Sequence, residues 1–222
     1  MRAIALLALL IFLPASGTAR LDPSSTLGVP SGVAPDVDGE LSEGEWNDAA
    51  TLELDEDTTL RLKHTDGVLY LGLSAGSMGI PSPCIRRNED VWVLHASAAL
   101  GTAVYEKDGE TWTQIRPFEW RCRERGFAES AIAAREEFLS EEGWLGTIGH
   151  LGNRRHFEFR IDLLQEVSLE ILFLFLDTRS PMRLVSWPSD LSSTPVYADL
   201  VTGPIPESVP FDLRGWARLE LE

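Results

Sequence analysis

The sequence predicts an all-β fold: an antiparallel β-sandwich, jelly-roll-like, with one inserted α-helix near residues 128–142. Three observations support this prediction. Short runs of alternating apolar and polar residues recur along the chain. Asp-Gly pairs at 66–67 and 108–109 separate such runs, as in hairpin turns. The apolar period becomes helical over one long stretch, at 128–142.

The N-terminal residues read as an export signal. Arg2 precedes an apolar run from Ala3 to Leu13, and the small residues 17–19 form a cleavage site. A membrane-spanning helix needs about 20 apolar residues, so we expect no membrane insertion. The chain is expected to divide into a signal peptide, a flexible N-terminal arm and a single β-sandwich domain, at residues 1–19, 20–34 and 35–222. The protein is therefore expected to be exported, to the periplasm or the medium.

The charge balance limits the partners. The chain has 35 acidic and 19 basic residues and a formal net charge of −16. Such a surface repels nucleic acid and anionic lipid. We expect a monomer that binds no nucleic acid.

The first segment of the domain is PDVDGELSEGEWNDAA, residues 35–50. Asp38-Gly39 predicts a tight turn. Ser42 and Glu45 have capping-box spacing, which predicts one short helical turn. Trp46 is expected to face the core.

The next segments predict most of the strands. Residues 60–65 and 68–73 alternate around Asp66-Gly67, and a two-residue turn places the leucines of both strands on one face. Gly76 to Asn88 is expected to be a loop, and 90–98 a strand. A second hairpin around Asp108-Gly109 places Tyr105 directly opposite Trp112.

The rest of the chain is predicted as strands, the helix and one long loop. Phe118, Trp120 and Cys122 are expected on one strand face. The apolar run 169–176 predicts a strand buried on both faces. Further strands are expected at 157–161 and 216–221, with an extended loop over 186–211.

The two cysteines, Cys84 and Cys122, are expected to form a disulfide because an exported chain meets an oxidising compartment.

The opening segment and the first hairpin resemble a known family. An Asp-Gly-x-Leu turn followed by an acidic, Trp-bearing turn is similar to the start of family-nine carbohydrate-binding modules and the wider DOMON-like β-sandwich group. A strand ending in aspartate before a Leu-Tyr strand, as at residues 60–73, also matches that pattern. The resemblance implies a β-sandwich and non-catalytic recognition of a carbohydrate or envelope glycan.

Sugar rings stack their C–H faces on aromatic side chains, while polar groups bind their hydroxyls. Tyr105 and Trp112 are the predicted sheet platform, with Lys107 and Glu110 beside them. The predicted ligand-binding residues are Tyr105, Trp112, Gln114, Arg116, Trp144 and Trp187.

Two other functions stay open. Some DOMON-like domains bind haem through Met with His or Lys, and Met78, Met182, His64 and His95 are the candidate ligands. A hydrolase would use the cluster of Asp90, His95 and Ser97, although no Gly-x-Ser-x-Gly motif is present.

No cofactor is expected, with structural calcium as the alternative. Asp36, Asp38 and Glu40 form one acidic cluster, and residues 55–57 form another. Hard oxygen ligands of this kind suit calcium.

Overall fold

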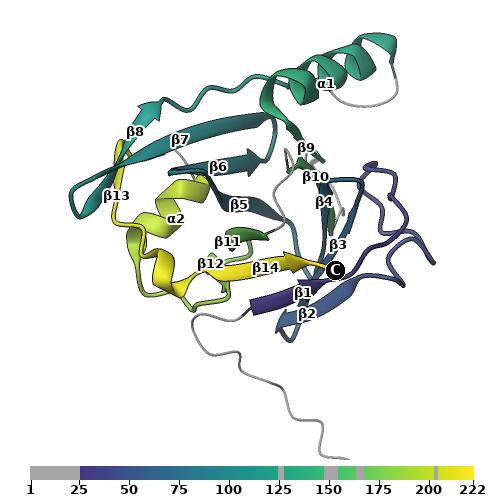
Figure 1. The fold of residues 1–222 in the computed structure, drawn as a ribbon, viewed down its shortest axis with the longest axis horizontal. Helices are drawn as coiled ribbons and strands as arrows, with labels where there is room; N and C mark the ends of the chain where they lie inside the picture. The colour runs from purple at the N-terminus through teal and green to yellow at the C-terminus, as the bar shows by residue number, and fades with distance from the viewer. Residues whose placement is uncertain (1–25, 125–127, 148–154, 164–167, 203–204) are drawn as a thin grey trace, which may run out of the picture.

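The computed structural model describes residues 26–124, 128–147, 155–163, 168–202 and 205–222 (Figure 1). The predicted signal peptide lies outside these ranges. Among the described residues, no helix is long and apolar enough to cross a membrane.

Two sheets make up the fold, as predicted (Figure 1). The larger sheet runs in the order β1-β14-β11-β5-β6-β7-β8-β13, and β12 also pairs with β11. Its strands are β1 (Thr26–Val29), β5 (Gly79–Arg87), β6 (Asp90–Ala96), β7 (Leu100–Asp108), β8 (Thr111–Arg116), β11 (Ser168–Asp177), β12 (Arg183–Trp187), β13 (Ser208–Val209) and β14 (Ala217–Leu221).

The smaller sheet runs in the order β2-β3-β4-β10-β9. Its strands are β2 (Ala50–Asp55), β3 (Thr58–Thr65), β4 (Val68–Ala75), β10 (His156–Asp162) and β9 (Trp144–Gly146). All pairings between named strands are antiparallel except that of β1 with β14, which is parallel. Part of the predicted N-terminal arm is therefore an ordered edge strand.

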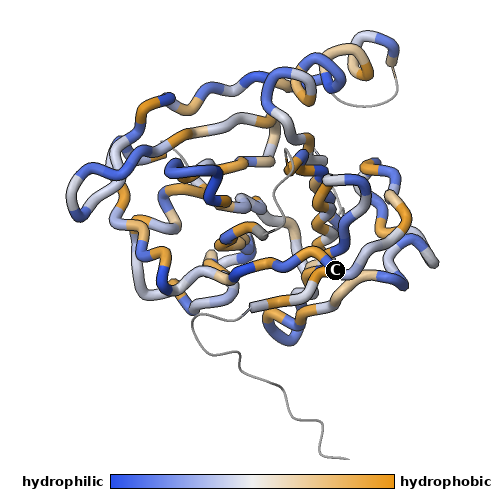
Figure 2. Tube along the Cα trace, viewed as in Figure 1, coloured by the Kyte–Doolittle hydropathy of each residue, from blue (hydrophilic) through white to orange (hydrophobic). Residues whose placement is uncertain are grey.

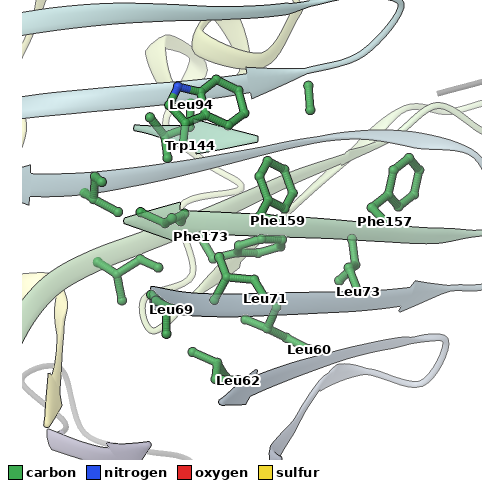
Figure 3. Packing of buried hydrophobic residues seen from close by; sticks show 14 of the residues in the cluster. Leu60, Leu62, Leu69, Leu71, Leu73, Leu94, Trp144, Phe157, Phe159 and Phe173 are labelled. Atoms are coloured by element: carbon green, nitrogen blue, oxygen red, sulfur yellow. The ribbon is translucent and has the colours of Figure 1, made fainter. Parts of the chain in front are cut away.

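The main core lies between the sheets and confirms the predicted first hairpin. Leu60 pairs with Leu73 and Leu62 with Leu71 across the Asp66-Gly67 turn, in the expected register. All four leucines are buried, and Leu71 and Leu73 lie beside the rings of Phe159 and Phe157 on the neighbouring strand β10 (Figure 3). Alternation at period two places them on one face of the sheet.

A second apolar cluster covers the outer face of the larger sheet. It joins Tyr105 and Leu172 to the helix α2 (Pro195–Thr202) and to residues of the segment 205–216. This cluster explains why the predicted all-apolar strand, now β11, is buried on both faces. The extended loop predicted over 186–211 is wrong in this part, since Pro195 starts a helix there. Proline suits a first helical position because its missing N–H has no partner to lose.

The helix α1 (Glu129–Glu142) confirms the predicted insertion and lies at one end of the molecule (Figure 1). Gly143 ends it in the left-handed conformation, and its N–H donates to the Leu139 carbonyl at 2.8 Å. Ala131 and Phe138 are buried, whereas Ile132 is exposed.

The second hairpin has a different register from the predicted one. Gly109 and Glu110 form the turn, so Trp112 lies opposite Lys107 and Tyr105 lies opposite Gln114. Gly109 has φ 62°, which glycine adopts without strain. Tyr105 and Trp112 still share one face of the sheet.

The segment predicted as a loop at 76–88 contains the strand β5. Pro81 and Pro83 misled the prediction because proline lacks the N–H of a strand. They lie two residues apart, so both place the missing N–H on the same side. At Pro81 and Pro83, β5 pairs only with β11, because β6 joins its other side from Cys84 onward.

Two shorter predictions also differ from the structure. Residues 42–49 form successive turns rather than a helix, although Ser42 N–H donates to the Glu45 carboxylate at 3.2 Å, as in a capping box. Trp46 is buried as expected. Residues 117–121 are not a strand, and Cys122 makes an isolated bridge to Leu100.

The predicted disulfide is not formed. Cys84 and Cys122 are free, buried thiols. Cys84 belongs to the outer cluster and Cys122 to the core between the sheets. The larger sheet therefore separates the two sulfurs.

Candidate functional site

The sheet platform predicted from Tyr105 and Trp112 is buried. Tyr105 is 0% and Trp112 3% exposed, and both rings pack edge-to-face on Phe211. The Tyr105 hydroxyl donates to the Pro206 carbonyl at 2.7 Å, and Trp112 Nε1 donates to the Phe211 carbonyl at 3.1 Å. Both side chains fasten the segment 205–211 to the sheet, so neither ring face is open to a ligand.

The predicted loop tryptophans belong to strands and to the inner core. Trp144 starts β9, is fully buried, and donates from Nε1 to Thr102 Oγ1 at 2.8 Å. Trp187 ends β12 and is 7% exposed. Neither tryptophan is exposed at the surface, as a ligand-binding residue would need to be.

The predicted polar partners are divided between two places. Lys107 and Glu110 lie on the exposed, hydrophilic tip of the β7–β8 hairpin (Figure 2). Gln114 is half-buried in β8, and its Nε2 atom has no hydrogen-bond partner in the described part of the chain. Arg116 instead points toward α1, where it pairs with Glu142 at 2.9 Å. The six predicted ligand-binding residues therefore do not converge.

His95 and Ser97 form a hydrogen-bonded pair without Asp90. His95 Nε2 lies 3.2 Å from Ser97 Oγ, and His95 Nδ1 lies 3.1 Å from Ser82 Oγ. Asp90 is at the other end of β6, roughly 16 Å away at the strand rise per residue. Burial lowers the pKa of His95 to about 4, so the imidazole is neutral near pH 7. The predicted triad lacks its carboxylate.

Of the candidate haem ligands, both histidines are hydrogen-bonded, Met182 is exposed and Met78 is half-buried. His64 Nε2 lies 2.9 Å from the Glu222 carbonyl oxygen, and both His95 nitrogens adjoin serine hydroxyls. Met182 is 65% exposed on the surface. These contacts favour structural roles for the two histidines.

Of the two acidic stretches expected to suit calcium, the one at residues 55–57 forms ion pairs with distant arginines. Asp55 pairs with Arg183 at 2.7 Å and Asp57 with Arg179 at 3.3 Å. Within the described ranges, no three acidic, histidine or cysteine side chains converge as a metal site.

A surface pocket lies beside α2, on the outer side of the larger sheet. Its volume is about 410 Å³, within the range of small-molecule sites. Apolar and aromatic side chains alternate with polar groups around it. The lining residues are Leu172, Ser189, Leu191, Tyr197, Asp212, Arg214, Gly215 and Trp216.

An ion pair occupies the exposed side of this pocket. Arg214 Nε and Nη2 donate to the two carboxylate oxygens of Asp212, each at 2.8 Å. These bonds lower the pKa of Asp212, which keeps the carboxylate ionised near neutral pH. The Arg214 side chain is 91% exposed and the Asp212 side chain 57%, so both can still bind a ligand.

Ser189, another lining residue, is tied to the same segment. Ser189 Oγ donates to the Gly215 carbonyl at 2.7 Å, and Ser186 Oγ donates to the Ser189 carbonyl at 2.6 Å. The loop after β12 is thereby held against the segment before β14. This arrangement preorganises the pocket without closing it.

Sequence reasoning missed the pocket because its residues are far apart in the chain. Trp216 was predicted only as the start of the last strand. The only local clue to the pocket was the spacing of Asp212 and Arg214, which are two residues apart and can form a bidentate ion pair. Their approach to Tyr197 depends on α2, which the prolines of 186–211 concealed.

Comparison with known proteins adds little. No family model and no curated protein matches this sequence. The structure is similar to that of a "putative carbohydrate-binding protein" from Bacteroides uniformis ATCC 8492, over 89% of this chain and 99% of that one. The sequence identity is 9% and the TM-score 0.45, too low to carry an argument about function.

Proposed function

We propose that this protein is a non-catalytic carbohydrate-binding protein and that the pocket beside α2 holds the saccharide. One observation supports the proposal: the pocket combines aromatic and apolar lining with an exposed, bidentate Asp212–Arg214 pair. A sugar needs both kinds of surface, because its ring has apolar C–H faces and its rim carries hydroxyls.

The ion pair suits hydroxyl groups. The Asp212 carboxylate has lone pairs left to accept from sugar O–H groups, and the Arg214 guanidinium has further N–H donors. Because the two charges cancel locally, the site favours a neutral polyol over a free anion or cation. Tyr197 and Trp216 line the pocket but are each only 4% exposed, so they add a small apolar surface rather than an open stacking face.

The test is titration with a panel of glycans. The panel contains hexoses, β-1,4-linked hexasaccharides of glucose, xylose, mannose and N-acetylglucosamine, and soluble peptidoglycan fragments. Calorimetry measures affinity, and tryptophan emission reports on binding near any of the seven indoles, including Trp216 at the pocket. We expect at least one saccharide to bind and to shift the emission.

Asp212→Asn tests the location. It keeps an oxygen that can accept from Arg214 N–H but loses the carboxylate, so affinity should fall about tenfold or more. Glu110→Gln, the same change at the exposed tip of the β7–β8 hairpin, is the control and should bind like wild type. Unaltered affinity in Asp212→Asn would remove the pocket as the site. If no glycan of the panel binds, the proposed function is wrong.

A further inference from the structure

Trp120 is the one tryptophan of seven whose side chain is exposed. It is 42% exposed, whereas Trp46, Trp112, Trp144, Trp187 and Trp216 are 7% exposed or less, and Trp92 is half-buried. It follows β8, on a segment that the pocket does not include. The sequence analysis placed it on a strand face and gave it no role.

Two neighbouring rings hold the indole. Trp120 packs edge-to-face on Phe118, with ring centroids 4.7 Å apart, and on His95, at 5.0 Å. Phe118 and His95 also contact each other at 5.3 Å. The three rings form a closed set, so the indole is fixed before any ligand arrives. We call these rings together with Ser97 the Trp120 platform.

The platform depends on a close approach at Gly101. Gly101 lies opposite His95 in the β6–β7 ladder. A Cβ at this position would lie 2.4 Å from the Phe118 ring and 2.5 Å from the Glu119 carbonyl oxygen. The segment 117–121 therefore crosses directly over β7, where no side chain intervenes. A backbone bond from Arg121 N–H to the Leu100 carbonyl, 2.9 Å, holds it there.

A hydroxyl accompanies the exposed ring. Ser97 is half-buried, and its Oγ lies 3.2 Å from His95 Nε2. Ser82 Oγ adjoins the other imidazole nitrogen at 3.1 Å. A neutral imidazole offers one donor and one acceptor, so each serine can take one of them. Ser97 is thereby oriented and keeps capacity for a further hydrogen bond beside the indole.

We infer that the Trp120 platform is a second saccharide-contacting surface, on which a sugar ring stacks against Trp120 and hydrogen-bonds to Ser97. This inference rests on the proposed function and adds to it a surface outside the pocket. A fixed aromatic ring beside an oriented hydroxyl matches the two requirements of a sugar ring. The flanking Glu119 and Arg121 are exposed and charged, so the apolar surface of this segment is narrow. That width suits a sugar better than a protein partner.

The experiment compares four proteins, each as the full domain. Wild type, Trp120→Ala, Trp120→Phe and the control Ile115→Ala are titrated with the hexasaccharides of the panel. Ile115 is also an exposed apolar residue, 54% exposed, and it precedes the same segment. Affinity is measured by calorimetry, and the indole N–H signal of Trp120 is followed by ¹⁵N NMR.

We expect the Trp120 signal to move when a hexasaccharide binds. Trp120→Ala should lower the affinity for that hexasaccharide at least about fivefold. The affinities of Trp120→Phe and Ile115→Ala should stay within about twofold of wild type. Thermal unfolding of each variant checks that the domain is intact. If Trp120→Ala is unstable, the wild-type indole N–H signal decides the test, because a Trp120 signal that stays in place when the hexasaccharide binds overturns the platform.

The outcomes separate the two proposals. Binding that Asp212→Asn weakens, with a static Trp120 signal and unaltered affinity in Trp120→Ala, would overturn the platform and leave the pocket. Binding that depends on Trp120 but not on Asp212 supports the platform and removes the pocket. No binding by any glycan overturns both.

Discussion

Glu158 shows how one side chain connects the opening segment to the fold. It is 0% exposed in β10, and its Oε2 atom accepts from Gly39 N–H at 2.7 Å and from Asp38 N–H at 3.0 Å. The other oxygen, Oε1, has no hydrogen-bond partner among the residues that the structure describes. The Asp-Gly turn that resembles a family signature thus serves here to bind a buried carboxylate.

Burial raises the pKa of Glu158 to about 7, against the opposing effect of the Gly39 N–H bond. Between pH 4.5 and about 7, Glu158 is therefore protonated in the folded protein, whereas in the unfolded chain, where its pKa is 4.5, it has released the proton. The stability from this proton is full below pH 4.5 and is lost as the pH rises through about 7.

Glu158→Gln should remove this pH dependence. The amide oxygen still accepts from Asp38 and Gly39 N–H, and no charge is buried. At pH 8 we expect the free energy of unfolding of the variant to exceed that of wild type by on the order of 2 kcal/mol, and its Tm to be higher. Near pH 4.5 the two proteins should have the same Tm. Glu56→Gln, an exposed control, should follow wild type throughout. Parallel Tm curves for wild type and Glu158→Gln would contradict this account.

At the scale of elements, α1 is attached through its last residue. Glu142 is 4% exposed and accepts from Arg116 and Arg121, each at 2.9 Å, and from Thr102 Oγ1 at 2.8 Å. Thr102 in turn accepts from Trp144 Nε1. The network joins the helix to β7, to β8 and to the inner core.

Glu142→Ala should loosen this attachment. It leaves Thr102 and two guanidinium groups without their shared acceptor, and the arginines can only partly rehydrate. We expect a loss of about 2–3 kcal/mol in the free energy of unfolding by urea.

Glu141→Ala is the matched control. Glu141 pairs with Arg121 at the surface, where both side chains are more than 40% exposed, and its loss should cost less than about 1 kcal/mol. Equal effects of the two substitutions would show that burial of Glu142 does not matter.

Local patterns predicted some elements and misjudged others for identifiable reasons. The β3–β4 hairpin follows from alternation and an Asp-Gly turn within 14 residues, and α1 from a change of period. The β5 strand and α2 contain prolines at positions where the missing N–H has no partner. Proline interrupts a strand or helix only where its missing N–H would have donated a hydrogen bond. In a sheet, whether that bond would form depends on strands that are distant in the sequence.

At the scale of the whole molecule, the candidate site was misplaced because the larger sheet is covered on both faces. Alternation correctly placed Tyr105 and Trp112 on one side of their hairpin. It carried no information that α2 and residues 205–216 return to cover that side. The exposed Trp120 was equally hidden, since its position follows from the crossing at Gly101. Burial is a long-range property, whereas the sequence patterns used here are local.

The same two-faced sheet decides the state of the cysteines. A disulfide needs Cβ atoms about 3.8 Å apart, but Cys84 and Cys122 belong to clusters on opposite faces of the sheet. Burial also raises the pKa of both thiols, which slows their reaction with oxidants and alkylating reagents. We therefore expect the protein to keep two reduced cysteines even under oxidising conditions.

An assay with a thiol-reactive chromophore should find almost no reaction in native buffer and two thiols per chain in denaturant. A reductant should leave the Tm unchanged, because no cross-link restrains the unfolded chain. Cys122→Ala should show one thiol in denaturant and lose only the packing of one small buried side chain. A mass 2 Da below that of the reduced chain, together with a Tm lowered by reductant, would instead establish the disulfide and require the sheet around Cys84 to rearrange.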